Sequence, residues 1–122
     1  MLHQRTIAKT IETSGVGLHS GKKVQMTLRP ASENSGIRFR RMDTIPVKEV
    51  HAISENVTDT NLGTTISQND TSVMTIEHLL SALVGLGIDN LYIDLHGPEI
   101  PIMDGSAASF ILLIESAGIE EQ

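Results

Sequence analysis

The stretch TIEHLLSALVGL, residues 75–86, has the apolar spacing of an amphipathic α-helix, and the arrangement of the rest of the chain depends on it. At about 100° per residue, one face of this helix carries Ile76 together with five more large apolar side chains. They are Leu79, Leu80, Leu83, Val84 and Leu86. Such a face has to pack against a sheet. Glycine commonly stops a helix, so we expect this one to end at Gly85 or Gly87.

Glu77 and His78 stand side by side in the first turn of this helix. Glu77 falls at the edge of the apolar face, whereas His78 falls almost opposite it. The neighbours of His78 on that outer face are small: Ser81, Ala82 and Gly85. A face of small residues lets a ligand or another domain approach closely. An ordinary surface histidine beside a glutamate that favours the helix dipole is the simpler interpretation, and the pattern leaves both open.

The segments on either side of the helix predict an α+β fold. Residues 23–29 alternate cleanly, with Val24, Met26 and Leu28 on one face of a strand. Further strands are expected at residues 4–12, 36–41, 62–68 and 91–96, and extended pieces at 46–56. We expect residues 1–122 to form one domain, a two-layer sandwich in which two α-helices pack on one face of a single mixed β-sheet.

The second helix is expected to run from a cap at Ser106 to about Ala117, with Gly118 as its stop. Most of its apolar side chains form one broad stripe, but Leu112 falls on the opposite side. A two-layer domain would leave that side polar. Leu112 is therefore a weak indication of a partner above the helices, since single exposed leucines are common.

Charge and composition narrow the class of protein. The net charge of −6 argues weakly against nucleic acid, because that affinity comes mainly from cations set against phosphates. The basic clusters at residues 22–23 and 38–41 are more simply solvated turns and strand edges than an anion site. The absence of cysteine excludes disulfides and thiolate metal sites. No signal-peptide core or membrane span is apparent, so we expect a cytoplasmic protein.

Two features could carry chemistry, and neither is complete. The glycine spacing in GVGLHSGKK, residues 15–23, fits neither a P-loop nor a dinucleotide loop, and a simple hairpin turn leaves His19 unexplained. His78 is a plausible zinc ligand, and Glu77 is a plausible base beside it. Catalytic zinc usually needs three protein ligands, however, and no other histidine has ligand spacing to His78. Those histidines are His3, His19, His51 and His96.

Three motifs together closely resemble the N-terminal domain of the UDP-3-O-acyl-N-acetylglucosamine deacetylases. They are GVGLHSGKKV at residues 15–24, TIEHLLSALVGLGIDN at 75–90 and PEIPIMDGSAASF at 98–110. These deacetylases are zinc amidases of lipid A biosynthesis, the route to lipopolysaccharide in Gram-negative bacteria. The resemblance runs nearly end to end and implies two similar α+β domains, each with a sheet carrying two helices. The helix layers of the two domains would face each other across the active site.

The resemblance also implies roles for individual residues. Glu77 corresponds to the base that activates water, and His78 to a zinc ligand. His19 corresponds to a polar group near the active site, and Leu18 to a residue that lines the substrate region. The implied substrate-binding positions are Leu18, His19, Leu62 and Gly63.

Two aspartates are implied near these positions. Residues 59–62 match a segment beside the metal and the reacting acetamide, which places Asp59 there. Asn61 and Gly63 stand where some family members have Met and Cys. Asp104 matches the aspartate of the MDGS motif, for which a catalytic and a structural role in the loop are equally consistent with the sequence.

Length is the largest departure from the family. The family has a second domain that completes the zinc site, and we expect that domain to be absent from this chain. The full-length protein is implied to be a monomer that removes the 2-N-acetyl group of UDP-3-O-acyl-N-acetylglucosamine. The isolated chain should then be inactive and bind Zn²⁺ only weakly. The alternatives are a stand-alone protein-interaction module that uses the outer helical face, and a nucleic-acid module, which the acidic charge and scarce aromatic residues disfavour.

Overall fold

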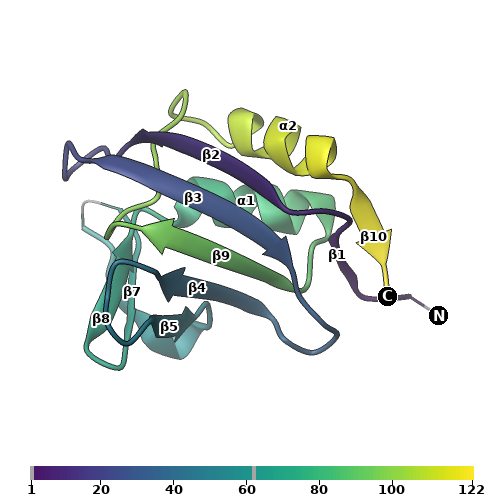
Figure 1. The fold of residues 1–122 in the computed structure, drawn as a ribbon, viewed down its shortest axis with the longest axis horizontal. Helices are drawn as coiled ribbons and strands as arrows, with labels where there is room; N and C mark the ends of the chain where they lie inside the picture. Colours follow the sequence, from purple (N-terminus) through teal and green to yellow (C-terminus); the bar gives the residue numbers. More distant parts are fainter. Residues whose placement is uncertain (1, 62) are drawn as a thin grey trace.

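The computed structural model describes residues 2–61 and 63–122, and its main feature is a five-stranded mixed β-sheet (Figure 1). In spatial order the strands are β2 (Ile11–Val16), β3 (Lys23–Pro30), β9 (Leu91–His96), β4 (Ile37–Arg41) and β5 (Lys48–His51). Strands β4 and β9 are parallel, and the other neighbours are antiparallel. The strands predicted at residues 23–29, 36–41 and 91–96 are confirmed.

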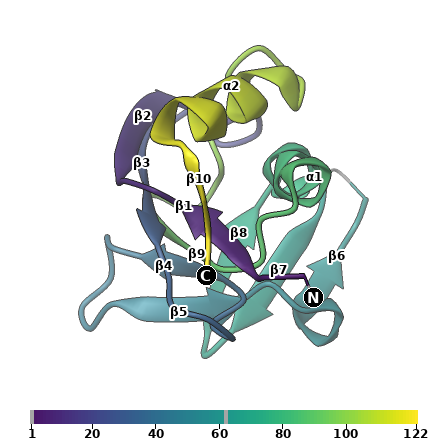
Figure 2. The same ribbon diagram turned by 90° about the vertical axis from the view of Figure 1, so that its right-hand side faces the viewer.

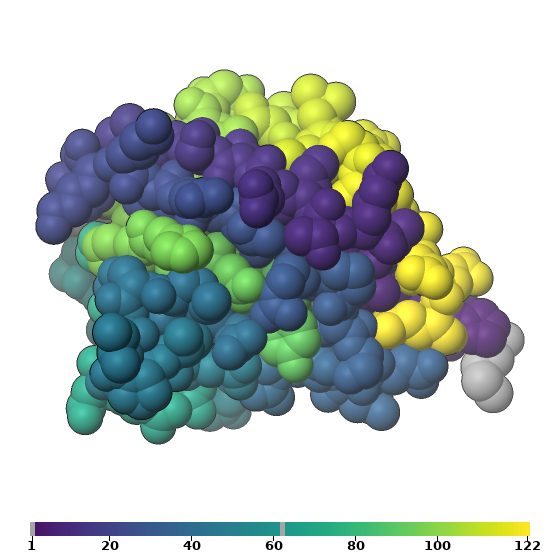
Figure 3. Space-filling model, viewed as in Figure 1, coloured from purple at the N-terminus to yellow at the C-terminus, as the bar shows by residue number. Residues whose placement is uncertain are grey.

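One face of this sheet carries the core and both helices. Val24, Met26 and Leu28 of β3 are fully buried, as their alternation predicts, while Gln25 on the same strand is exposed. Figure 2 shows α1 (Glu77–Leu86) and α2 (Ala108–Ala117) on the same side of the sheet. Their buried side chains join those of the sheet in one cluster that includes Phe39, Leu79, Leu83, Ile93, Leu95, Phe110 and Ile114. The opposite face of the sheet, with its strands side by side, is turned to the viewer in Figure 3.

The prediction of a single sheet is wrong. A two-stranded sheet pairs β1 (Arg5–Ile7) with β10 (Ile119–Glu121), and a three-stranded sheet contains β6 (Val57–Asp59), β7 (Thr65–Gln68) and β8 (Thr71–Met74). The strand predicted at residues 4–12 is divided between β1 and β2, which belong to different sheets. Ile7 of β1 is fully buried and lies opposite Ile119, far away in sequence, so alternation within residues 4–12 could not reveal this pairing.

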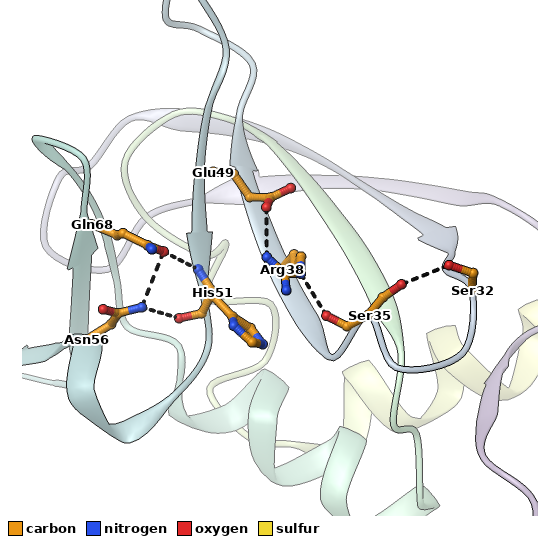
Figure 4. A network of polar contacts seen from close by, with 7 residues as sticks. All are labelled: Ser32, Ser35, Arg38, Glu49, His51, Asn56 and Gln68. Atoms are coloured by element: carbon orange, nitrogen blue, oxygen red, sulfur yellow. Dashed lines mark hydrogen bonds and ion pairs between the residues drawn. The ribbon is translucent and has the colours of Figure 1, made fainter.

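Side-chain hydrogen bonds link the end of β5 to η1 and to the three-stranded sheet (Figure 4). At the end of β5, the His51 N–H donates to Gln68 Oε1 at 2.9 Å, and the His51 carbonyl accepts from Asn56 Nδ2 at 2.7 Å. Asn56 lies in the short 3₁₀ helix η1 (Ser54–Asn56), and Gln68 ends β7. These side chains satisfy main-chain groups that a further paired strand would otherwise use.

Helix α1 is rotated relative to the sequence prediction. Leu79 and Leu83 are buried as expected, but Val84, expected in the core, is 81% exposed, and Ala82, expected outside, is fully buried. The predicted apolar face would be the buried one if a sheet alone covered α1. In the structure α1 also packs against α2, so its buried face extends to the small residue Ala82. The helix ends at Gly87, which has a left-handed φ of 68°.

Helix α2 largely follows its prediction. It ends before Gly118, but its N-cap residue is Ala107 and not Ser106, so the predicted cap is wrong by one residue. The Ser106 hydroxyl accepts a hydrogen bond from the Ala108 N–H at 3.3 Å. Leu112 is 69% exposed, as predicted from its position opposite the apolar stripe of the helix. No helix among residues 2–61 and 63–122 is long and apolar enough to cross a membrane.

The rotation of α1 predicts different costs for truncating two adjacent apolar residues. Leu83→Ala should lower the free energy of unfolding by about 2–5 kcal/mol, because it leaves a cavity in the core. Val84→Ala should change that free energy by less than about 0.5 kcal/mol in the 122-residue chain. Urea unfolding followed by circular dichroism measures both. Equal losses would contradict the observed rotation and favour the buried face predicted from the sequence, which includes Val84.

Candidate active site

Main-chain contacts bring separate segments together at the N-terminus of α1. The turn after β2 meets the loop after β9 through a bridge between Gly17 and Pro101. The same loop meets the end of β8 through a bridge between Met74 and Glu99. Because α1 begins three residues after Met74, the turn that carries Leu18 and His19 lies close in space to Glu77 and His78.

The Glu77 carboxylate points toward Gly63 and His19. Glu77 Oε2 accepts a hydrogen bond from the Thr64 N–H at 2.8 Å. A methyl group added to the α-carbon of Gly63 would lie 3.2 Å from Glu77 Oε1 and 3.8 Å from His19 Nε2. Glu77 and His19 therefore both approach the same point, and the absence of a side chain at residue 63 leaves that point open. Gly63 has a φ of 126°, which glycine adopts far more readily than other residues.

Two small hollows adjoin this point. One has a volume of about 90 Å³, and its walls include Leu18, Glu77, His78 and Phe110. The other has a volume of about 140 Å³, and its walls include His19, Asp59 and Gly63. Thr75 borders both hollows, so the two are adjacent.

The structure therefore brings together most of the residues singled out from the sequence. Six of them line these hollows: Leu18, His19, Asp59, Gly63, Glu77 and His78. Leu18 is 56% exposed, and His19 and Asp59 are also exposed, so the site is open to solvent. Leu62 lies outside the described residues.

Asp104 is not among the residues that line the two hollows. It lies in the exposed loop before α2, and its Oδ1 accepts hydrogen bonds from the Ser106 N–H at 3.0 Å and the Ser106 hydroxyl at 2.9 Å. Hydrogen bonds from the Ser106 and Ser109 hydroxyls lower the pKa of Asp104 below its usual value. These contacts are typical of a residue that shapes a turn at a helix start.

Sequence reasoning missed Glu99, which is fully buried behind the site. Its carboxylate accepts hydrogen bonds from the His19 N–H, the Ser20 N–H and the Thr75 hydroxyl. Burial raises the pKa of Glu99, but the hydrogen bonds from Thr75, Ser20 and His19 outweigh it, and the pKa lies below its usual value. A signal was present in the sequence, because Glu99 is a lone charge between proline and isoleucine in an otherwise apolar run.

His78 fits one position of a zinc site. It lies in the first turn of α1, half-exposed at the edge of the smaller hollow. Among the described residues, no three histidine, aspartate or glutamate side chains gather closely enough to hold a metal ion. Zinc in proteins takes about four ligands, so His78 could serve only together with ligands from outside this described part.

An α+β domain that brings a carboxylate–histidine pair at a helix N-terminus to a second histidine has the side chains of an acid–base hydrolase site. Comparison with known proteins narrows this class. Residues 4–122 match the family model LpxC, UDP-3-O-acyl N-acetylglycosamine deacetylase, and the chain belongs to this family.

Individual relatives agree with the family match. The chain is 62% identical over 122 residues to a UDP-3-O-acyl-N-acetylglucosamine deacetylase of Legionella pneumophila. It is 56% identical to the protein of that name from Pseudomonas entomophila and 55% identical to that from Methylococcus capsulatus. Each alignment covers all of this chain but 40% of the relative. The chain thus spans two fifths of the length of these relatives.

The lowered pKa of Glu99 predicts a specific dependence of stability on pH. A carboxyl group with a lower pKa in the folded state stabilises the fold above its unfolded pKa, ordinarily 4.5, and loses that contribution as the pH falls through its folded pKa. The free energy of unfolding should therefore fall on acidification below about pH 4.5, and fall less steeply in Glu99→Gln. At pH 7 this variant should be less stable by about 1–3 kcal/mol, because a buried donor loses its acceptor.

Urea unfolding from pH 7 to pH 3 measures both effects. Glu33→Gln is the matched control, since Glu33 is exposed in the loop after β3. An identical pH dependence in Glu99→Gln and in the control would contradict the ionised, hydrogen-bonded state of Glu99.

Proposed function

We propose that this chain is the first domain of a zinc-dependent deacetylase that hydrolyses the 2-N-acetyl group of UDP-3-O-acyl-N-acetylglucosamine in lipid A biosynthesis. The observation that carries the proposal is the approach of Glu77 Oε1 and His19 Nε2 to one open point at Gly63, beside His78. Membership of the LpxC family and the names of the relatives support it. The protein would act in the cytoplasm, on a substrate whose sugar carries the acetamide.

Glu77 is the proposed general base. Its Oε2 is held by the Thr64 N–H, which leaves Oε1 directed toward the open point at Gly63. A carboxylate fixed in this way can take the proton from an attacking water with little reorganisation. Acetate and a free amine are the products, and no covalent enzyme intermediate is required.

His78 is the proposed zinc ligand of this chain. Zinc, when bound, supplies Lewis-acid polarisation of the acetamide carbonyl. The main-chain N–H of His19 donates a hydrogen bond to the Glu99 carboxylate. The His19 ring reaches the same point at Gly63 and is the proposed polar group for the substrate. Leu18 and Phe110 give the adjoining hollow an apolar wall, and Leu18, Gly63 and Leu62 are the proposed substrate contacts.

A second domain is proposed to cover the helix layer and supply the remaining zinc ligands. Val84 on α1 and Leu112 on α2 are 81% and 69% exposed, although both are large and apolar. Ser81 and Gly85 are exposed on the same helix as Val84 and would permit close approach. The full-length protein would then be a monomer whose active site lies between its two domains.

The same apolar side chains favour one alternative, a stand-alone protein-interaction module that docks a separate protein on the helix layer. Sedimentation of the 122-residue chain beside Leu112→Ser separates the two. Self-association that Leu112→Ser abolishes would favour the module. A monomer in both cases would favour the deacetylase domain.

Replacing the proposed base tests the function directly. In the full-length protein, Glu77→Ala should lower kcat by about 10²–10⁴-fold, because no side chain remains to accept the proton. Zinc content should be unchanged, since Glu77 is not a proposed ligand. Acetate release and metal analysis of the same preparations measure the two quantities. Glu33→Gln serves as the control, and near-wild-type turnover in Glu77→Ala would remove Glu77 from this role.

Zinc titration tests the incompleteness of the metal site. The 122-residue chain should bind zinc weakly, and His78→Ala should bind it about as weakly, because one histidine does not make a site. The isolated chain should also release no acetate. Isothermal calorimetry measures the affinities. Tight one-to-one binding that His78→Ala abolishes would mean that this chain assembles a zinc site without a second domain.

A further inference from the structure

Glu99 occupies a place that an isolated buried charge could not hold. Its side chain is fully buried, and an ionised carboxylate there without hydrogen-bond donors would strongly destabilise the fold. Three donors offset that cost and come from two separate segments. They are the His19 N–H at 3.1 Å, the Ser20 N–H at 2.9 Å and the Thr75 hydroxyl at 2.6 Å.

On one side, Glu99 fixes the turn that carries His19. Both donors there are consecutive main-chain N–H groups, so they hold the backbone of the turn and not merely one side chain. The turn also leaves room for the carboxylate. A methyl group added at Gly17 would collide with Glu99 Oε1 and with Ser20 Oγ. Residue 17 therefore has to be glycine because a side chain would occupy the space of the Glu99 carboxylate. Its backbone conformation does not require glycine, since Gly17 has no positive φ.

On the other side, Glu99 fixes the entry to α1. Thr75 has a φ of 62°, a left-handed conformation that is unfavourable for a β-branched residue and needs compensating contacts. Its hydroxyl donates to Glu99, and its N–H donates to the Thr64 carbonyl at 2.9 Å. The Thr64 N–H in turn donates to Glu77. A short series of hydrogen bonds thus runs from Glu99 to the carboxylate of Glu77.

From these contacts we infer that Glu99 is a positioning residue for the reaction, which sets the His19 ring and the Glu77 carboxylate at their mutual distance around Gly63. The inference rests on the proposed function. Glu99 touches neither the open point nor either hollow, so it acts only through Thr75 and the His19 turn. A carboxylate suits the task because it only accepts hydrogen bonds, whereas the amide of glutamine would turn an N–H₂ group toward one of the donors.

The test compares Glu99→Gln with Gly17→Ala in the full-length, zinc-loaded protein, with Glu33→Gln as the control. Glu99→Gln removes an acceptor, and Gly17→Ala keeps the carboxylate but displaces it. In both, kcat per folded, zinc-loaded molecule should fall about 10- to 100-fold, the effect of misplacing reacting groups by about 1 Å. KM should change by a smaller factor than kcat, because only the proposed His19 contact is displaced and those of Leu18, Leu62 and Gly63 are not altered. Zinc content should stay at the wild-type value.

Amide chemical shifts distinguish a positioning role of Glu99 from a purely local structural role. A local role would not change the shift of the remote Thr64 amide. In ¹⁵N-resolved spectra, Glu99→Gln should shift the His19 and Ser20 amides, which lose a charged acceptor. It should also shift the remote Thr64 amide, because the Glu77 carboxylate bound to it moves. Spectra of Glu33→Gln should match those of the wild type at these positions.

The two measurements separate failure of this inference from failure of the proposed function. A wild-type kcat in folded, zinc-loaded Glu99→Gln would overturn the inference and leave the deacetylase intact. If the wild-type protein itself releases no acetate, the proposed function fails. The chemical shift of the Thr64 amide in Glu99→Gln then tests whether Glu99 positions Glu77. An unmoved Thr64 amide would overturn it, and a moved one would support it.

Discussion

The buried carboxylate of Glu99 is the constraint on which the arrangement of the site depends. A charge at a fully buried position is stable only where donors are fixed around it, and here those donors are the backbone of the His19 turn and the Thr75 hydroxyl. One local electrostatic demand therefore ties three segments together: the turn after β2, the loop after β9 and the start of α1. The left-handed conformation of Thr75 and the open space at Gly17 accompany these contacts.

The same segments bring the candidate site residues together at the surface. The candidate site lies where β2 and β9 of the five-stranded sheet and β8 of the three-stranded sheet end near the beginning of α1. His19 and Asp59 remain exposed, while the group that anchors the His19 turn is buried. A site that is open on one side and anchored on the other is suited to being completed from outside, which agrees with the proposed second domain. The exposed Val84 and Leu112 point to covering of the helix layer in the same way.

The division into three sheets follows a comparable logic. The end of β5 has main-chain groups that could pair with another strand, but Gln68 and Asn56 bind them with side chains (Figure 4). Arg41 adds a further link, because its Nη1 donates to the Ser72 carbonyl of β8 at 2.8 Å. Side-chain hydrogen bonds thus link the three-stranded sheet to β4 and β5 of the main sheet.

Local pattern in the sequence was sufficient for the parts that depend on one segment alone. The alternation in β3, the existence of both helices, the exposure of Leu112 and the motifs around His19, Glu77 and His78 could all be read from the chain, because periodicity reports which side of a segment is apolar. The division of residues 4–12 between two sheets, the exchange of Val84 for Ala82 in the buried face of α1 and the place of Glu99 could not. Each depends on a partner distant in sequence: β10 for β1, α2 for α1, and the His19 turn with Thr75 for Glu99. Only the tertiary structure decides such contacts, because a periodic pattern specifies that a face is buried but not which element buries it.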